Sequence, residues 1–202
     1  MSRKELKQAA KRLLGENYWP LVGAVLVVNG ILGAAAYAGG TVGAFFVSPL
    51  LTGLLCYIVS MARGRRDAFS SLFTEGFRGK YYLRRVGGMA WMSLFTYLWS
   101  LLFVVPGIVK SYSYALTPYL LATHPEIGAK QALKLSMKLM DGKKGELFLL
   151  DLSFLGWGLL SVLTFGALSV FYVSPYQTAT QTLWIARVVE QAEANGELLV
   201  QQ

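Results

Sequence analysis

Cysteine and histidine are almost absent from this sequence, which has one residue of each type in 202. The lone Cys56 excludes an internal disulfide, and we expect it to be a small buried apolar residue. Cys56 and His124 cannot by themselves form a usual zinc cluster. We therefore expect neither a metal site nor a cofactor.

Motifs for phosphate binding and nucleophilic catalysis are also missing. The segment Gly76–Lys80 (GFRGK) lacks the spacing of a phosphate-binding loop, and no GxSxG motif occurs. The sequence thus favours a protein that is not an enzyme. A membrane enzyme acting on lipid, with Asp151 as acid or base, is one alternative.

Charged residues are scarce, at 15% of the chain against 54% hydrophobic residues, whereas soluble domains carry about 25% charged residues. The mean hydropathy is +0.46. No charge occurs in Tyr18–Ala62 or in Val86–Val109. Because about 20 apolar residues cross the hydrocarbon core of a bilayer, the composition predicts an all-α integral membrane protein.

Six membrane-spanning helices are predicted, each about 16 to 22 residues long. They are Tyr18–Ala38, Thr41–Ala62, Val86–Val105, Gly107–Thr123, Glu146–Phe165 and Ala167–Val188. Gly39-Gly40, Pro106-Gly107 and Gly166 form very short connections, which predict three antiparallel hairpins. A kinked or partly re-entrant helix is an alternative for the fourth span, which is rich in Ser and Tyr.

The basic residues predict the orientation of these spans. They lie in residues 3–12, 63–85 and 130–144 and at Arg187, and Lys110 alone among the 19 falls on the opposite side. Because cytoplasmic loops carry the Lys/Arg excess, we expect a multi-pass protein of the bacterial cytoplasmic membrane with both termini in the cytoplasm. The net charge of +8 then favours anionic lipid, and nothing indicates nucleic acid.

The first span also has features of a cleavable signal peptide. A basic start and an apolar run precede Ala36-Tyr37-Ala38, which resembles a cleavage site. The apolar run is longer than in a typical signal peptide, so we expect an uncleaved span.

A repeated phrase suggests a threefold internal repeat. FFVSPLLTG begins at Phe45 and FYVSPYQTA at Phe171. Hydroxyl-proline pairs at Pro49, Pro118 and Pro175 place one proline in the second helix of each hairpin, where proline is expected to kink the helix. The single membrane domain, 1–202, would then comprise units 1–62, 63–123 and 124–202, each starting with a cytoplasmic amphipathic interfacial helix. The kinks would let the hairpins wrap a common centre, or act as hinges around a cavity.

Lysines recur every four residues in the third amphipathic stretch, at Lys130, Lys134 and Lys138. Such a stripe is typical of a helix at the lipid headgroup boundary. We expect these lysines, with Arg65 and Arg66, to contact anionic lipid.

Polar residues inside the spans define a candidate intramembrane site. Asp151 is the only acidic residue well inside a span, and such groups are costly and often functional. The candidate site comprises Asp151, Gln177, Gln181, Tyr176, Ser111 and Tyr114. Structural pairing between helices and a wet substrate path are the two interpretations. Gly23, Gly30, Gly33, Gly39 and Gly43 are expected to permit close packing of the first hairpin.

Several short motifs resemble a bacterial integral-membrane family, domain of unknown function 975. They are Leu72-Phe73 with Gly76-Phe77, Leu98–Leu102 leading to Pro106–Ile108, Ser136, Met140, Gly142, Leu147–Phe154 with Gly156-Trp157, and Pro175-Tyr176. The resemblance implies a bacterial cytoplasmic-membrane protein and no particular activity. The chain is also distantly similar to the membrane domain of some glycerophosphodiester phosphodiesterases, which implies lipid contact by analogy.

Three hypotheses follow. The first is a non-catalytic membrane module that binds lipid or a partner membrane protein through its basic interfacial helices. The second is a small transporter or channel with a path between the proline-kinked helices, and the third is the lipid-directed enzyme.

Overall fold

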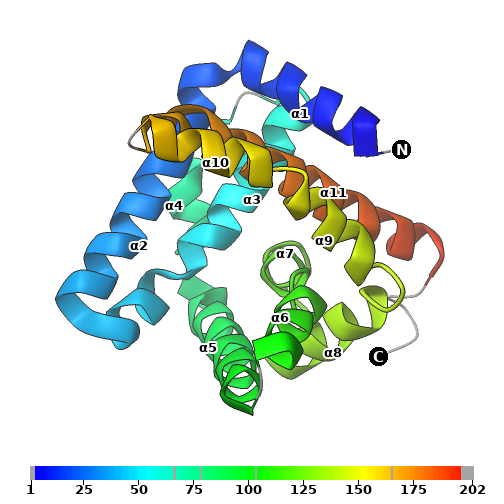
Figure 1. The fold of residues 1–202 in the computed structure, drawn as a ribbon. Coiled ribbons are helices and arrows are strands. Elements are labelled where there is room, and N and C mark those ends of the chain that lie inside the picture. The colour runs from blue at the N-terminus through cyan, green and yellow to red at the C-terminus, as the bar shows by residue number, and fades with distance from the viewer. Residues whose placement is uncertain (1–2, 66, 78, 103, 165, 197–202) are drawn as a thin grey trace.

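The computed structural model describes residues 3–65, 67–77, 79–102, 104–164 and 166–196 (Figure 1). This part of the chain contains α-helices and one π-helical segment and no strand, so the all-helical prediction is confirmed. The elements are α1 (Arg3–Glu16), α2 (Tyr18–Val47), α3 (Pro49–Ala62), α4 (Ser71–Gly76), α5 (Gly79–Leu102), α6 (Val104–Ser113), α7 (Thr117–Thr123), α8 (Ala129–Leu139), α9 (Lys144–Leu152), α10 (Leu155–Leu163), η1 (Ser169–Val173) and α11 (Ser174–Ala194).

The first hairpin is formed by α2 and α3. α2 turns at Gly40, whose φ of 61° and ψ of −154° favour glycine because it lacks a Cβ atom. The turn therefore lies where Gly39-Gly40 predicts it. The expected second span, Thr41–Ala62, is divided at Ser48 into the last part of α2 and the 14-residue α3, next to the expected kink at Pro49. That this segment crosses a membrane stays a prediction.

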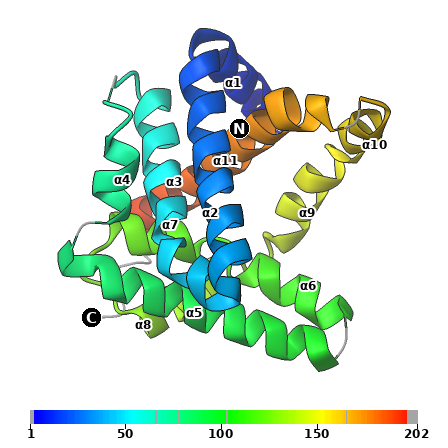
Figure 2. The same ribbon diagram turned by 90° about the vertical axis from the view of Figure 1, so that its left-hand side faces the viewer.

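The second pair, α5 and α6, runs across the lower end of α2 and α3 (Figure 2). The fourth expected span, Gly107–Thr123, is divided into α6 and α7, which agrees with the kinked alternative. Ser136 of α8 bridges the break, because its hydroxyl accepts from Leu116 N at 3.2 Å and donates to Ser113 O at 2.8 Å. Backbone groups freed by the break are thereby satisfied from another helix.

The third helix pair consists of α9 with α10 and of η1 with α11, and its first member is interrupted as well. α9 and α10 follow one another with a break at Ser153-Phe154, and together they extend away from the other helices (Figure 2). Gly166, with φ of 83°, begins the return through η1 into α11. α11 then contacts α1, α2, α3, α7, α8 and α9, so the C-terminal helix is the central element of the fold.

The three prolines each lie just after a change in helical geometry. Pro49, Pro118 and Pro175 lie in the first turns of α3, α7 and α11. Proline is tolerated there because the first backbone N–H groups of a helix have no partner within it. The role of these prolines as kinks or hinges stays a prediction, and α3, α7 and α11 do contact one another, as the common-centre interpretation expects. The threefold repeat and its unit boundaries stay predictions.

A helix precedes each helix pair, as expected. α1, α4 and α8 each bury an apolar side, through residues such as Leu13, Leu72 and Leu135. These apolar sides pack into the two apolar cores of the protein itself. In α8 this differs from the expected burial in lipid, because α5, α7 and α11 cover that side.

Close packing at glycine occurs at one expected position, Gly43, where an added Cβ would lie 2.5 Å from Ala35 O on the other side of the Gly40 turn. It also occurs at a position that was not expected, Gly53. A Cβ added at Gly30, Gly33 or Gly39 would meet nothing within 4 Å, so the packing role expected for these glycines is wrong. A Cβ at Gly53 would instead lie 2.1 Å from Leu72 O. Gly53 therefore allows α3 and α4 to approach each other.

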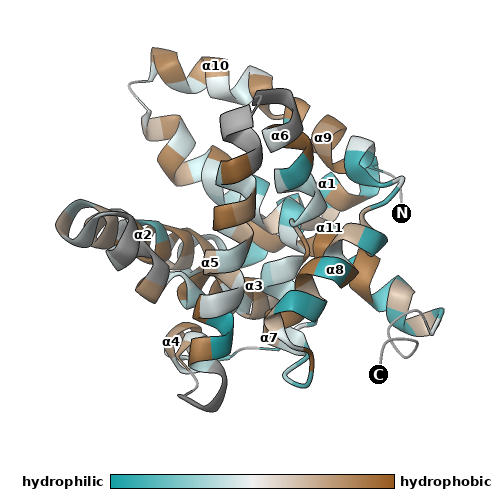
Figure 3. Cartoon of the chain, turned by 90° about the horizontal axis from the view of Figure 1, so that it is seen from below, coloured by the Kyte–Doolittle hydropathy of each residue, from teal (hydrophilic) through white to brown (hydrophobic). Residues whose placement is uncertain are grey.

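Two helical segments in the described part of the chain are long and apolar enough to cross a membrane, Tyr18–Gly40 and Lys144–Leu163. Only 28% and 22% of their apolar windows are buried, unlike the core helices of soluble proteins. Brown, apolar residues cover much of α10, which lies at the periphery (Figure 3). These features indicate membrane association, and the six-span architecture is not confirmed.

Candidate functional site

Asp151 of α9 joins three helices through hydrogen bonds. The hydroxyl of Tyr112 on α6 donates to Asp151 Oδ2 at 3.0 Å, and Gln181 Nε2 on α11 donates to Asp151 Oδ1 at 2.5 Å. Both oxygens of the half-buried carboxylate thus have a donor. The structure thus brings together Asp151 and Gln181, two members of the candidate site.

These residues lie on a cavity of about 480 Å³. Its lining is half polar and half apolar: Ser111, Tyr112, Asp151 and Gln181 with Ile108, Ala115, Leu147 and Ile185. The cavity thus combines an acidic group, an amide and two hydroxyls with apolar walls, a combination typical of small-ligand sites. Ser111, a predicted member, is in this lining.

Three predicted members lie elsewhere. Tyr176 donates to Lys7 O at 3.3 Å and packs edge-on against Phe154 at 5.2 Å between ring centroids. Tyr114 is buried, and Gln177 does not line the Asp151 cavity. The sequence indicated the Ser-Tyr run of residues 111–114 but not which tyrosine meets Asp151, because the α6–α7 break determines which side of the helix faces α9.

Lys7 also belongs to the Tyr176 environment. Its Nζ lies 4.5 Å from the centroid of the Phe154 ring, an attractive cation–π arrangement. Partial burial lowers the pKa of Lys7 because burial disfavours the charged amine. This contact fixes α1 against the break between α9 and α10.

The lysine stripe of α8 is exposed, and its contact with lipid stays a prediction. Lys130, Lys134 and Lys138 are all exposed, and Lys130 Nζ lies 5.6 Å from the centroid of the Trp91 ring on α5. Arg65 is exposed as well, whereas Arg66 lies outside the described residues. The basic residues expected to contact lipid are thus accessible wherever the structure describes them.

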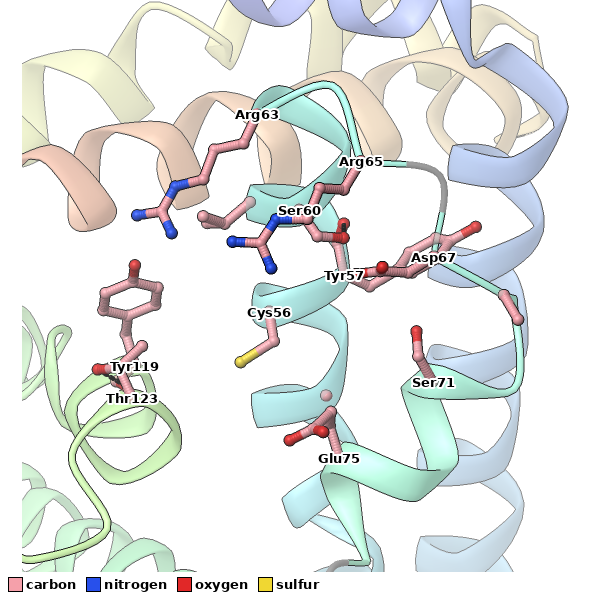
Figure 4. A pocket seen from close by; sticks show the side chains of 13 residues that line it. Cys56, Tyr57, Ser60, Arg63, Arg65, Asp67, Ser71, Glu75, Tyr119 and Thr123 are labelled. Atoms are coloured by element: carbon pink, nitrogen blue, oxygen red, sulfur yellow. Dashed lines mark hydrogen bonds between the residues drawn. The ribbon is translucent and has the colours of Figure 1, made fainter.

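A second cavity, of about 400 Å³, lies between α3, α4 and α7 (Figure 4). Its lining includes Cys56, Arg63, Arg65, Asp67, Glu75 and Tyr119. The sequence analysis named only Arg65 and Cys56 of this lining, Arg65 as a lipid contact and Cys56 as a buried apolar residue. The RGRRD sequence of residues 63–67 was a signal of clustered charge, but the contribution of α7 depends on tertiary packing.

Arg63 links this cavity to α11. Its Nη2 lies 2.5 Å from Glu190 Oε1, and this hydrogen bond raises the pKa of the guanidinium, with nearby Tyr119 and Glu193 acting in the same direction. Both members of the Arg63–Glu190 pair are about half exposed, so water weakens the attraction.

Metal binding has no support in the described part of the chain, where no group of three or more His, Cys, Asp and Glu side chains is placed to hold an ion.

Comparisons with known proteins identify the family. No curated protein and no solved structure is significantly similar to the chain, so the likeness to the membrane domain of glycerophosphodiester phosphodiesterases stays a prediction. The family described as "Protein of unknown function (DUF975)" matches residues 86–192, just over half of the chain. The match includes the Asp151 cavity and the α8 lysines but not Arg63 or Arg65. The chain belongs to the DUF975 family.

Proposed function

We propose that the chain is a multi-pass protein of the bacterial cytoplasmic membrane that binds anionic lipid or a partner membrane protein without catalysing a reaction. Both termini are in the cytoplasm in this proposal. The observation that carries it is the amount of exposed apolar surface. Tyr37 of α2 is 95% exposed, and Val162 and Leu163 of α10 are 75% and 77% exposed. Such surfaces mark protein or membrane contacts.

The exposed lysines of α8 support the lipid-binding part of the proposal. A cationic stripe beside apolar membrane-contacting surface is attracted to anionic headgroups, by about 1 kcal/mol per Lys or Arg near the surface. The aromatic ring of Trp91 beside Lys130 adds a group that favours the headgroup region.

Single-cysteine labelling tests the topology. In a Cys56→Ser background, cysteine replaces Arg65, Val109, Lys134 or Thr164, and a membrane-impermeant maleimide is applied to right-side-out and inverted vesicles. Six spans place Arg65 and Lys134 in the cytoplasm and the other two positions outside. If only Tyr18–Gly40 and Lys144–Leu163 crossed, then Arg65, Val109 and Lys134 would all label from one side, and the six-span proposal would fail.

Lipid selectivity tests the binding role. The purified protein in uncharged detergent is titrated with phosphatidylglycerol or phosphatidylcholine, and its Tm is measured. We expect phosphatidylglycerol to raise Tm more, and Lys130→Gln/Lys134→Gln/Lys138→Gln to lose most of that difference. Lys110→Gln is the control on the other side of the membrane. An equal response of the triple variant and the wild type would contradict a role for α8.

The Asp151 cavity favours a small transporter or channel as the second candidate. An ionisable residue in an apolar segment is a functional-site hypothesis by default, and the cavity gives Asp151 space beside Ser111 and Gln181. Proteoliposomes would then show a solute or proton flux that Asp151→Asn abolishes. If Asp151 is a structural link, Asp151→Asn changes stability but no flux.

A further inference from the structure

The cavity between α3, α4 and α7 has opposite charges within one small volume. Figure 4 shows the Arg63 and Arg65 guanidiniums together, with the Cys56 side chain and the Tyr119 hydroxyl directed toward the same space and Glu75 at its other end. Asp67 completes the charged part of the lining. Two basic and two acidic side chains therefore surround about 400 Å³, a volume suited to a small ligand.

The two arginines differ in their partners. Arg63 is held by Glu190 of α11, which fixes the guanidinium at the cavity edge. The exposed side chain of Arg65 makes no ion pair or hydrogen bond within the described residues. The Arg65 guanidinium can therefore donate to an anion, since a guanidinium binds phosphate through two parallel N–H···O hydrogen bonds.

The balance of charges selects the class of ligand. A simple anion would be attracted by Arg65 but repelled by Asp67 and Glu75. A simple cation would be repelled by the guanidiniums. A molecule with a negative and a positive group a few bonds apart matches both ends, and hydroxyls such as that of Tyr119 add neutral donors.

We propose that this cavity binds a zwitterion carrying a phosphate and a primary ammonium, the chemistry of a phosphoethanolamine headgroup. Arg65 and Tyr119 would hold the phosphate, and Glu75 with Asp67 would hold the ammonium. The proposal rests on the membrane function proposed above and names one lipid class for it. In that topology Arg63 directly follows the second span, so the cavity lies at headgroup depth.

Protection of Cys56 tests the proposal on the unaltered chain. Cys56 is the only cysteine, and its sulfur is directed into the cavity (Figure 4). The protein in uncharged detergent is alkylated with iodoacetamide, and the rate is followed by intact-mass spectrometry. With dihexanoyl phosphatidylethanolamine at ten times its Kd, occupancy near nine-tenths should slow alkylation by about tenfold.

Matched probes separate the two sources of the headgroup and the competing ligand classes. Protection by free phosphoethanolamine supports the site with a soluble ligand as a source, and protection only by the short-chain lipid supports it with a membrane source. Equal protection by dihexanoyl phosphatidylglycerol would overturn the proposal, because that lipid has no ammonium. Absence of protection by either zwitterion would also overturn it.

Two variants assign the ends of the ligand. Arg65→Gln should lose protection by every phosphate-containing probe, and Glu75→Gln should lose the preference for ethanolamine over glycerol headgroups. Arg3→Gln on exposed α1 is the control. An unchanged preference in Glu75→Gln, with Tm like the wild type, would overturn the ammonium assignment. If Cys56 protection fails while the α8 lysines still confer the response to phosphatidylglycerol, only this inference falls and the proposed function stands.

Discussion

Gln181 and Asp151, thirty residues apart, are joined by a hydrogen bond of 2.5 Å between the amide Nε2 and Oδ1. The bond connects α11 to α9, and Tyr112 extends the link to α6 through the other carboxylate oxygen. α9 is a peripheral helix with an exposed apolar surface, and these polar contacts fix its position against α11 and α6. Polar links of this kind hold helices together where apolar packing alone gives little selectivity.

Asp151→Asn is expected to weaken this link. The asparagine amide cannot accept from both donors, so one charge-assisted hydrogen bond is lost, at a cost of about 1–3 kcal/mol in the free energy of unfolding. Reversible unfolding in mixed micelles measures the change. A double-mutant cycle with Gln181→Leu should give a nonzero coupling energy, whereas additive effects would contradict a direct Asp151–Gln181 interaction.

Arg85→Gln should lower the free energy of unfolding by more than is usual for a charged residue in a cytoplasmic segment. Arg85 is only 2% exposed, and its guanidinium donates to the carbonyls of Glu75, Gly76, Leu121 and Ala122 at the ends of α4 and α7. Cations near the last carbonyls of a helix are stabilising. We expect the free energy of unfolding to fall by about 1.5–3 kcal/mol, the range for hydrogen bonds from a charged group.

The control for Arg85 is Arg12→Gln, because Arg12 is exposed on α1. Its removal should change the free energy of unfolding by less than about 0.5 kcal/mol. The free energy of unfolding of Arg85→Lys should lie between those of the wild type and Arg85→Gln, since lysine retains the charge but lacks the planar guanidinium group. A loss in Arg85→Gln no larger than in Arg12→Gln would show that the carbonyl contacts contribute nothing.

The sequence predicted much of the helical organisation because apolar runs, glycine turns and proline positions are local signals. The turn at Gly40 and the helices that precede each pair are examples. Arg85 shows what such signals miss. Its charge predicted only a cytoplasmic position, whereas the folded chain buries it against carbonyls of two other helices.

The breaks within the expected spans depend on contacts distant in the sequence. The gap between α6 and α7 is tolerated because Ser136, on α8, bonds Ser113 O and Leu116 N. The hydropathy of residues 107–123 cannot reveal this contact, because Ser136 lies outside that segment. The same is true of the candidate site, where Asp151 was identified from its charge but Tyr112 only from the packing of α6 on α9.

Gly53→Ala is expected to separate α3 from α4. The added Cβ would lie 2.1 Å from Leu72 O and 3.2 Å from Gly76 N, so backbone must move. Overpacking of this kind costs about 1–3 kcal/mol, and the Tm of the purified protein should fall accordingly. Since Gly53 also lines the α3–α4–α7 cavity, the loss should be accompanied by faster alkylation of Cys56.

Gly33→Ala is the matched control in α2, because no atom lies within 4 Å of the added Cβ. Alanine should stabilise this helix by about 0.5–1 kcal/mol through its better helix propensity. If Gly53→Ala lowers the Tm and Gly33→Ala raises it, the steric contact at Gly53 explains the difference between the two substitutions. A destabilising Gly33→Ala would instead indicate a partner surface on α2.

Glu190→Gln should have a small effect on stability despite the short distance to Arg63. Both side chains are about half exposed, and exposed ion pairs contribute about 0–1 kcal/mol. Added salt should reduce the difference between wild type and variant further, because ions screen exposed charges. The larger expected effect is on the position of Arg63. Without Glu190, the Arg63 guanidinium is free to move toward Arg65, and phosphate-containing ligands should protect Cys56 from alkylation at lower concentration.

Glu16→Gln is the control, because it removes an exposed charge from α1 and should leave the protection of Cys56 unchanged. A Tm loss in Glu190→Gln as large as that of Arg85→Gln would show that the pair is a structural clamp, and weaker protection would show that Glu190 positions Arg63 for the ligand.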